Sequence, residues 1–282
     1  ALHRHAAGKG LNVAQVLADL GHQVTVSGFL GEANPQSFEA LFAQRGFTDA
    51  FIRVPGETRS NIKLAERSGR VTDLNGPGPV VDDQAQAALL ARLHDIAAGH
   101  DAVVVAGSLP RGVSPEWFQA LLEQLAHMGL KVALDTSGAA LRAGLKTRPW
   151  LIKPNTHELT EVLGSSVETP AEQAAAAQRL LADGVANVVI SQGERGVNWF
   201  AAGLALQALP PTVEVASTVG AGDSLLAGLV HGLLSEQAPE HSLRTATAIA
   251  AMAVTQIGFG ISDAAHLARL ESGVSVRPLT EQ

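Results

Sequence analysis

The sequence predicts an α/β fold in which a mostly parallel sheet is covered by helices on both faces. Short, wholly apolar segments with strong β character alternate with amphipathic helical segments along almost the whole chain, a pattern typical of parallel sheets. The predicted strands span residues 24–29, 102–105, 131–134, 150–152 and 187–190. The predicted helices span residues 13–20, 84–98, 115–127, 171–182 and 225–234.

Two of these helices carry clear start signals. Thr169 stands directly before Pro170 and three positions before Glu172, which is the pattern of a capping box with proline at the first helical position. Ser114 and Pro115 open the helix at residues 115–127 in the same way. These signals predict where both helices begin.

Residues 58–75 interrupt the alternation. Segments 61–66 and 70–74 read as two short strands around a Ser-Gly turn, with no helix between them, and this predicts an antiparallel pair. We expect the pair to lie over the mouth of a site as a lid. Because no linker, repeat or low-complexity tract divides the chain, residues 1–282 are expected to form a single domain.

Composition and charge exclude several classes of protein. Hydrophobic residues make up 46% of the chain and charged residues 17%, which favours a folded protein over a disordered one. The net charge of −7 disfavours nucleic acid as a partner, although local cations and backbone amides can still hold a small anion. No cysteine is present, so disulfides, thiolate metal sites and thiol nucleophiles are excluded. No apolar run reaches membrane-spanning length and no signal peptide opens the chain, so we expect a cytoplasmic protein without a membrane partner.

The strongest candidate for chemistry is the segment 218–224, which reads Thr-Val-Gly-Ala-Gly-Asp-Ser and leads into the predicted helix 225–234. A glycine-rich turn before a helix leaves backbone N–H groups bare and aligned with the helix dipole, so it can hold a phosphoryl group. Asp223 would be well placed there to take a proton from an attacking hydroxyl. On its own, the segment fits equally well a tight loop with Asp223 as a helix-dipole partner.

Two further segments offer donors for phosphate or sugar oxygens. Gly8-Lys9-Gly10 precedes a helix and is followed by Asn12, but its spacing is not that of a P-loop, and taken alone an ordinary helix entry explains it better. In residues 58–63, Thr-Arg-Ser-Asn-Ile-Lys, the polar side chains at 59, 61 and 63 alternate onto one face of an extended strand. They could clamp a phosphate, and a solvated strand face would look the same.

Two turns after predicted strands could face a nucleotide. Asn155 and Glu158, after the strand 150–152, could organise a hydrated Mg²⁺, or they could form a capping box. The glycine-rich segment 191–196 follows the strand 187–190 and could approach a nucleotide closely, or it could be a hairpin turn into residues 197–200. The histidines show no metal-ligand spacing, and motifs of serine hydrolases and nicotinamide dehydrogenases are absent from the sequence.

Taken together and in this order, the motifs resemble the PfkB, or ribokinase, family of carbohydrate kinases. They are Gly-Lys-Gly-x-Asn-Val-Ala, Thr-Arg-x-Asn-x-Lys, Gly-Ser-Leu-Pro at 107–110, Lys-Pro-Asn-x-x-Glu, Ser-x-Gly-x-x-Gly and Gly-Ala-Gly-Asp. The resemblance runs from about residue 6 to residue 267. It is closest to the 1-phosphofructokinase and tagatose-6-phosphate kinase branch, because ribokinases and adenosine kinases do not usually carry the pattern of Arg59 and Lys63.

The resemblance implies a ribokinase-like αβα sandwich with a small β lid at about residues 58–75, often shared across a homodimer. It implies ATP and Mg²⁺ as cofactors and Asp223 as the base that deprotonates the sugar hydroxyl. The implied anion hole consists of Gly220, Ala221 and Gly222. The implied nucleotide-binding residues are Ser191, Gly193, Glu194, Gly196, Asn155, Glu158 and Gly222, of which Asn155 and Glu158 position the metal through water. The implied phosphosugar-binding residues are Lys9, Asn12, Arg59, Lys63, Ser108 and Asp223.

Members of the family also begin with a further strand that carries an Asn-Pro-x-x-Asp type segment, whose Asp grips sugar hydroxyls. This sequence opens at Ala1, just before the Gly-Lys-Gly motif. If the protein itself lacks this strand, we expect a central position of the sheet to be empty and the sugar site to lack that Asp. The alternative is that this sequence is a shortened form or begins at a misplaced start.

The activity implied is transfer of the ATP γ-phosphoryl group to a ketohexose monophosphate, foremost fructose 1-phosphate at its 6-hydroxyl, giving fructose 1,6-bisphosphate. Tagatose 6-phosphate or another sugar is an alternative substrate that fits the same clamp. An alternative of another class is a non-catalytic sensor that binds a sugar phosphate. A rise of the melting temperature on addition of the ligand, without ADP production, would favour the sensor.

Overall fold

The computed structural model describes residues 6–65 and 71–279, and the side chains of residues 62–65 and 71–73 also lie outside the description. The helices of the described chain are α1 (Lys9–Asp19), α2 (Gln36–Arg45), α3 (Asp83–Ala97), α4 (Pro115–His127), α5 (Gly138–Leu145), α6 (Thr156–Leu163), α7 (Pro170–Ala182), α8 (Ala221–Leu234), α9 (Pro239–Val254) and α10 (Ala264–Gly273). The strands are β1 (Thr25–Gly31), β2 (Thr48–Val54), β3 (Asn61–Ala65), β4 (Val71–Asn75), β5 (Ala102–Ala106), β6 (Lys131–Asp135), β7 (Leu151–Ile152), β8 (Asn187–Ser191), β9 (Val197–Ala201), β10 (Leu204–Leu209) and β11 (Ser275–Pro278).

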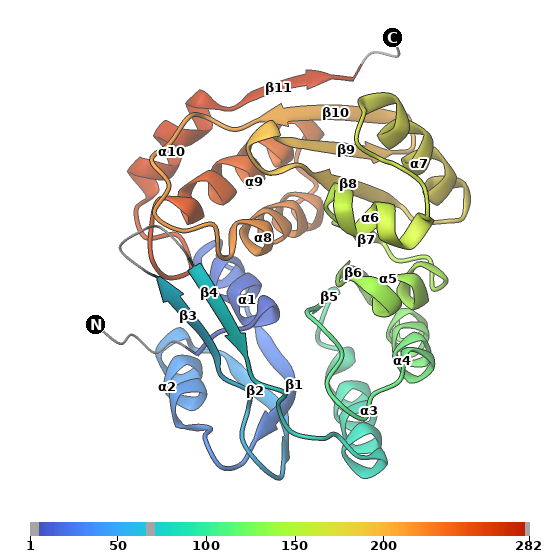
Figure 1. The fold of residues 1–282 in the computed structure, drawn as a ribbon, viewed down its shortest axis with the longest axis vertical. Helices are drawn as coiled ribbons and strands as arrows, with labels where there is room; N and C mark the ends of the chain where they lie inside the picture. The colour runs from blue at the N-terminus through green and yellow to red at the C-terminus, as the bar shows by residue number, and fades with distance from the viewer. Residues whose placement is uncertain (1–5, 66–70, 280–282) are drawn as a thin grey trace.

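The main sheet has seven strands in the order β11-β10-β9-β8-β7-β6-β5. Strands β5 to β8 are parallel, and β9, β10 and β11 each pair in antiparallel fashion with their neighbour. β10 therefore runs in the same direction as β8, so most of the strands share one direction. This confirms the mostly parallel sheet predicted from the apolar strands, and Figure 1 shows it with helices on both sides.

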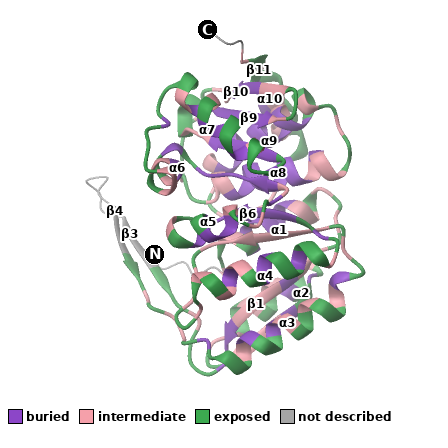
Figure 2. Cartoon of the chain, turned by 90° about the vertical axis from the view of Figure 1, so that its right-hand side faces the viewer, coloured by how far each residue is buried: buried purple, intermediate pink, exposed green. Residues whose placement is uncertain are grey.

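Alternate side chains of the sheet pack into two separate cores. Leu151 and Val189 face one side, where they join a cluster with residues of α1, α8, α9 and α10. Ile152 and Val188, next to them along the same strands, face the other side and join residues of α4 to α7. This alternation follows from the two-residue repeat of a strand, and it explains why the strands are apolar on both faces. Figure 2 shows the resulting contrast between the nearly buried α8 and the half-exposed α4.

β1 and β2 form a parallel pair of their own. Their core is a smaller cluster in which Leu11 and Ala14 of α1 pack with Leu30, Phe42 and other residues of β1 and α2. Among the described residues, β1 pairs only with β2, and β5 pairs only with β6. β1–β2 and the seven-stranded sheet are therefore separate sheets in the described residues, and α1 contacts both β1 and β5.

β3 and β4 form a third, antiparallel sheet, drawn in teal in Figure 1. Asn61 is opposite Asn75, and Lys63 is opposite Asp73. The predicted antiparallel pair is therefore present, and its predicted Ser68-Gly69 turn lies outside the described residues. No helix in the described part of the chain is both long and apolar enough to span a membrane.

The predicted helix starts are also present. Ser114 Oγ accepts a hydrogen bond from Trp117 N, and Thr169 and Glu172 form a complete capping box. One predicted boundary is wrong, because α8 begins at Ala221 and not at residue 225. Gly220 adopts the left-handed conformation, with φ of 84°, as the N-cap residue, so the helical turn already includes Gly222 and Asp223.

Candidate active site

The candidate site residues gather where four neighbouring parallel strands end. Ser108 follows β5, Asp135 ends β6, Lys153 follows β7, and Ser191 ends β8. The carboxyl ends of parallel strands meet at one edge of a sheet, which is where α/β proteins bind their ligands. The N-terminus of α8 lies at this same edge. Asp223 in its first turn is close enough to Asp135 and Lys153 for their charges to act on its pKa.

The first turn of α8 presents bare backbone donors. The first backbone N–H of this helix with an acceptor in the helix is that of Ser224, which donates to Gly220 O over 2.8 Å. The N–H groups before it, those of the Gly220-Ala221-Gly222 turn and Asp223, have no acceptor within the helix. Gly220 also has no side chain to cap them. Such donors, together with the helix dipole, are of the kind that bind anions, and the segment Gly220–Gly222 is called the anion-binding turn below.

Asp223 is held in place from α1. Asn12 Nδ2 donates to Asp223 Oδ2 over 2.8 Å, and both side chains are buried. Burial raises the pKa of Asp223 above the ordinary value of 3.8, the hydrogen bond from Asn12 opposes this, and nearby Asp135 adds to it. This hydrogen bond engages Oδ2, and within the described part of the chain Oδ1 of Asp223 accepts no hydrogen bond.

The structure adds two charged residues, Asp135 and Lys153, that the sequence did not predict to belong to the site. Asp135 is 1% exposed and Lys153 is 4% exposed. Lys153 Nζ lies 3.4 Å from Asp135 Oδ1, and Lys9 Nζ lies 3.2 Å from Asp135 Oδ2. A Cβ on Gly222 would come within 3.2 Å of Lys153 Nζ, so this buried ammonium group lies directly beside the anion-binding turn.

Lys9 lies among three carboxylates of the site. Burial lowers its pKa, but the carboxylates of Asp135, Asp223 and Glu158 raise it more, so the net pKa lies above the ordinary value of 10.5. Lys9 is therefore a cation at physiological pH. It brings positive charge between the carboxylate proposed as base and the turn after β7.

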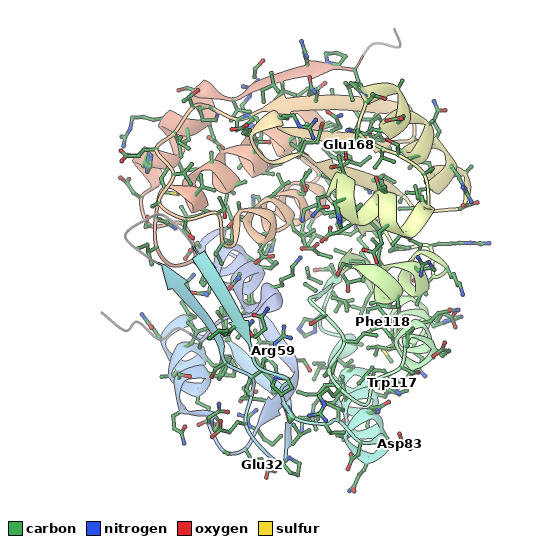
Figure 3. All side chains as sticks on the ribbon, viewed as in Figure 1. Glu32, Arg59, Asp83, Trp117, Phe118 and Glu168 are labelled. Atoms are coloured by element: carbon green, nitrogen blue, oxygen red, sulfur yellow. The ribbon has the colours of Figure 1, made fainter. Side chains whose placement is uncertain are left out.

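Two residues of the predicted phosphate clamp contact each other. Arg59 Nη2 donates to Ser108 Oγ over 3.3 Å, and Figure 3 labels Arg59 on the segment that leads into β3. This contact joins the β3–β4 pair to the carboxyl end of β5. Lys63 lies on β3, but its side chain is outside the described residues, so its place in the clamp stays a prediction.

Asn155 and Glu158 form a reciprocal capping box at the start of α6. Glu158 N donates to Asn155 Oδ1 over 2.8 Å, and Asn155 N donates to Glu158 Oε2 over 2.9 Å. The capping alternative raised by the sequence is therefore correct, and it uses one oxygen of each side chain. In the described residues no three His, Cys, Asp or Glu side chains cluster closely enough to hold a metal ion directly.

The glycine-rich segment 191–196 is the turn of the β8–β9 hairpin, as one reading of the sequence predicted. Ser191 forms a bridge with Asn155, and its N–H donates to Pro154 O, so this turn lies beside the capping box. Gly193 and Glu194 form one short 3₁₀ turn with Arg195. Gly196 has φ of 94°, and a Cβ there would meet Ala208 O at 2.1 Å, so only glycine fits.

Comparison with known proteins identifies the family. A family model described as pfkB family carbohydrate kinase matches residues 1–265. This chain belongs to the PfkB family of carbohydrate kinases. The family resemblance and the fold predicted from the sequence motifs are thereby confirmed.

Similar PfkB kinases carry informative names. The 1-phosphofructokinase of Vibrio cholerae is 48% identical over 275 residues, which cover 98% of this chain and 87% of the relative. The 1-phosphofructokinase of Escherichia coli K12 is 45% identical over 274 residues, which cover 97% and 88%. Among solved structures, Escherichia coli phosphofructokinase-2 in complex with fructose-6-phosphate has a TM-score of 0.83 at 26% identity, covering 95% of this chain and 87% of the other.

Membership of the PfkB family makes the chain a kinase, a phosphotransferase with an alcohol group as acceptor. It also implies ATP as the phosphoryl donor. A PfkB kinase needs a base for the alcohol, donors for the phosphoryl group and cations for the phosphates. Asp223, the anion-binding turn and the pair Lys9 and Lys153 are groups of these three kinds at one edge of the sheet.

Proposed function

We propose that this PfkB kinase transfers the γ-phosphoryl group of ATP to the 6-hydroxyl of fructose 1-phosphate, forming fructose 1,6-bisphosphate and ADP. The observation that carries the proposal is the position of Asp223: a buried carboxylate, oriented by Asn12, in the first turn of a helix with bare N–H donors. The relatives named 1-phosphofructokinase support the choice of sugar.

Asp223 acts as the general base. Oδ1 of Asp223 accepts the proton of the sugar 6-hydroxyl while the hydroxyl oxygen attacks the γ-phosphorus of ATP. The bond from that phosphorus to the bridging oxygen breaks, and ADP leaves. The N–H groups of Ala221 and Gly222 and the ammonium group of Lys153 stabilise the charge on the transferring phosphoryl oxygens. Lys9 holds the phosphosugar, and Asn12 keeps the base in position.

Ser191, Gly193, Glu194 and Gly196 are proposed to line the nucleotide site, and Arg59, Lys63 and Ser108 to hold the phosphate of the sugar. The contact of Arg59 with Ser108 supports the second assignment, because it joins the lid segment 58–75 to the edge of the main sheet. A bidentate guanidinium is well suited to a phosphate group.

Mg²⁺ fits the turn after β7. The capping box uses Oε2 of Glu158. Buried Oδ1 of Asp135 is ion-paired with Lys153 Nζ at 3.4 Å but accepts no hydrogen bond among the described residues. Asn155, Glu158 and Asp135 are oxygen donors of the kind Mg²⁺ prefers, with water completing its shell. A bound Mg²⁺ would supply positive charge to the ATP phosphates, and Asn155 and Glu158 would orient its water molecules.

We also propose that the chain works as a homodimer through the β3–β4 pair. Leu74 on β4 is 51% exposed, and the two strands pair only with each other in the described residues. Exposed strand edges of this kind readily pair with another chain. Escherichia coli phosphofructokinase-2, a solved relative, has a tetrameric form. Light scattering tests the proposed dimer, and a monomer under assay conditions would contradict it.

The test of the proposed function is a coupled ADP-release assay with MgATP and fructose 1-phosphate, tagatose 6-phosphate, fructose 6-phosphate or ribose. The proposal predicts the highest kcat/KM with fructose 1-phosphate. Preference for tagatose 6-phosphate would keep the mechanism and change the substrate. Thermal stabilisation by a sugar phosphate without ADP release from any of the four would instead support a non-catalytic sensor.

A further inference from the structure

A chain of three amide side chains runs from the protein core to the 191–196 turn. Asn198 on β9 and Gln173 on α7 are both 0% exposed. Asn198 Nδ2 donates to Gln173 Oε1 over 2.7 Å, and Gln173 Nε2 donates to Gln192 Oε1 over 3.1 Å. Gln173 Nε2 also makes a longer contact, 3.5 Å, to the carbonyl of Glu168, which Figure 3 labels.

The direction of this chain is fixed by the chemistry of amides. A side-chain amide has one oxygen that accepts and one nitrogen that donates. Because the Glu168 carbonyl can only accept, the nitrogen of Gln173 points toward it and toward Gln192, and the oxygen of Gln173 faces Asn198. Buried amides are costly unless they are hydrogen-bonded, so Gln173, whose oxygen and nitrogen are both engaged, has little freedom to rearrange. Oδ1 of Asn198 has no partner among the described residues.

Gln192 links the amide chain to the backbone of the 191–196 turn. Its backbone N–H donates to Gly196 O over 2.9 Å, and its carbonyl accepts from Arg195 N over 3.2 Å. The same residue therefore closes the 191–196 turn with its backbone and receives the amide chain with its side chain. The nitrogen of the Gln192 side chain is buried and has no partner among the described residues, so it does not anchor the turn to anything else.

We propose that Gln173 and Asn198 are positioning residues for the nucleotide. They do not touch it; they hold Gln192, and through Gln192 they keep the 191–196 turn in the shape that binds ATP. This inference rests on the proposed assignment of that turn to the nucleotide site. It predicts that a change in the core at α7 weakens nucleotide binding and leaves phosphoryl transfer and sugar binding intact.

The test compares Gln173→Met with a matched control. Met has a similar length and cannot hydrogen-bond to Gln192. Asn187→Leu is the control, because Asn187 is also a buried amide, on β8 itself, but it bonds to Trp150 O and Trp199 Nε1 at the other end of the strand. For each protein, the melting temperature, the Kd of ADP, the KM values and kcat are measured.

Gln173→Met is expected to raise the Kd of ADP and the KM of ATP by roughly three- to tenfold, the equivalent of about one hydrogen bond. Its kcat and its KM for the sugar should stay within about twofold. Asn187→Leu should lower the melting temperature without changing nucleotide binding. Equal weakening of nucleotide binding in both variants, or none in Gln173→Met, would overturn the inference.

Two more variants separate this inference from the assignment of the turn. Gln192→Ala should weaken ADP binding as Gln173→Met does, and the double variant should be no weaker than either single one, because both break the same chain. Additive effects would overturn the inference. Gly193→Asp places a negative charge in the turn, where Gly193 has φ of 60° and open space for a side chain, a conformation that Asp tolerates. Unchanged ADP binding in Gly193→Asp would refute the assignment of the turn itself, whereas weaker binding there with normal binding in Gln173→Met would refute only the amide chain.

Discussion

Asn12 Nδ2 and Asp223 Oδ2 lie 2.8 Å apart and join α1 to α8 across 211 positions of the sequence. Burial raises the pKa of the Asp223 carboxyl, and this hydrogen bond pulls the pKa back down because it stabilises the charged form. The two residues therefore set together the pH range in which Asp223 can take a proton. That range decides when the proposed base is active.

Removing the donor should shift the pH dependence of catalysis. In Asn12→Leu the pKa of Asp223 should rise further, so the acid limb of kcat should move to higher pH. The measurement is kcat against pH at saturating ATP and fructose 1-phosphate. Gln15→Leu, a change at another buried amide of α1, should leave the limb where it is, and an unmoved limb in Asn12→Leu would argue against Asp223 as the titrating group.

The clamp assignment predicts a selective loss of sugar binding. Arg59→Gln removes the guanidinium that reaches Ser108, so the KM for fructose 1-phosphate should rise by about tenfold or more, in line with roughly 1.5–3 kcal/mol for a charged hydrogen bond. The KM for ATP should change little. Arg53→Gln is a matched control, because Arg53 pairs with Asp49 and Glu39 away from the site. A rise in both KM values for Arg59→Gln would point to a general loss of structure.

The geometry of the anion-binding turn depends on Gly220. It has φ of 84°, and a Cβ there would come within 2.7 Å of the Phe259 ring. Gly220→Ala should therefore distort the turn and lower kcat by about 10²–10³, as loss of an oxyanion donor does. Gly46→Ala has a similar positive φ and open space around it, so it should lower stability without this loss of kcat.

The clash with Phe259 can be tested separately from the backbone strain. The double variant Gly220→Ala/Phe259→Ala removes the ring and keeps the left-handed alanine. Partial recovery of kcat would assign the loss to the clash. If Gly220→Ala alone keeps normal kcat, the turn does not hold the phosphoryl group in the way described above.

Asp223 should cost the protein stability at neutral pH. A carboxyl whose pKa is raised by folding stabilises the fold when protonated, below its ordinary value of 3.8, and this contribution is lost as the pH rises through the folded pKa. Ionised Asp223 is therefore destabilising at pH 7. Asp223→Asn should raise the melting temperature at pH 7, and the difference should shrink toward pH 4. Asp101→Asn, at an exposed carboxyl before β5, controls for the loss of one charge.

The sequence predicts most of the fold because each buried strand is a short apolar run and several helices carry capping signals. Helices α2, α5 and α10 and strands β2, β10 and β11 were not predicted. Only Phe42 of α2 is buried, so its sequence has almost no apolar periodicity, and β2 has no distinctive start signal. The start of α8 was placed four residues late, because Gly220 and Gly222 read as a loop, whereas only Gly220 leaves the helical conformation.

The candidate site could be predicted where its residues belong to local motifs. Asp223, Asn12 and Arg59 do, and the structure gives each of them a partner in the site. Asp135 and Lys153 were missed, because their pairing joins β6 to the turn after β7 and is visible only in three dimensions. The available signal was that both follow predicted apolar strands, as Ser108 and Ser191 do.

The most direct test of the central claim is the turnover of Asp223→Asn with ATP and fructose 1-phosphate, measured beside its affinity for ADP. The account predicts a loss of kcat of at least about 10²–10⁴, the range for general-base catalysis, with the Kd of ADP within a few-fold of the unmodified protein. Turnover within tenfold of the unmodified protein, or loss of ADP binding in parallel with turnover, would contradict the role of Asp223 as the base.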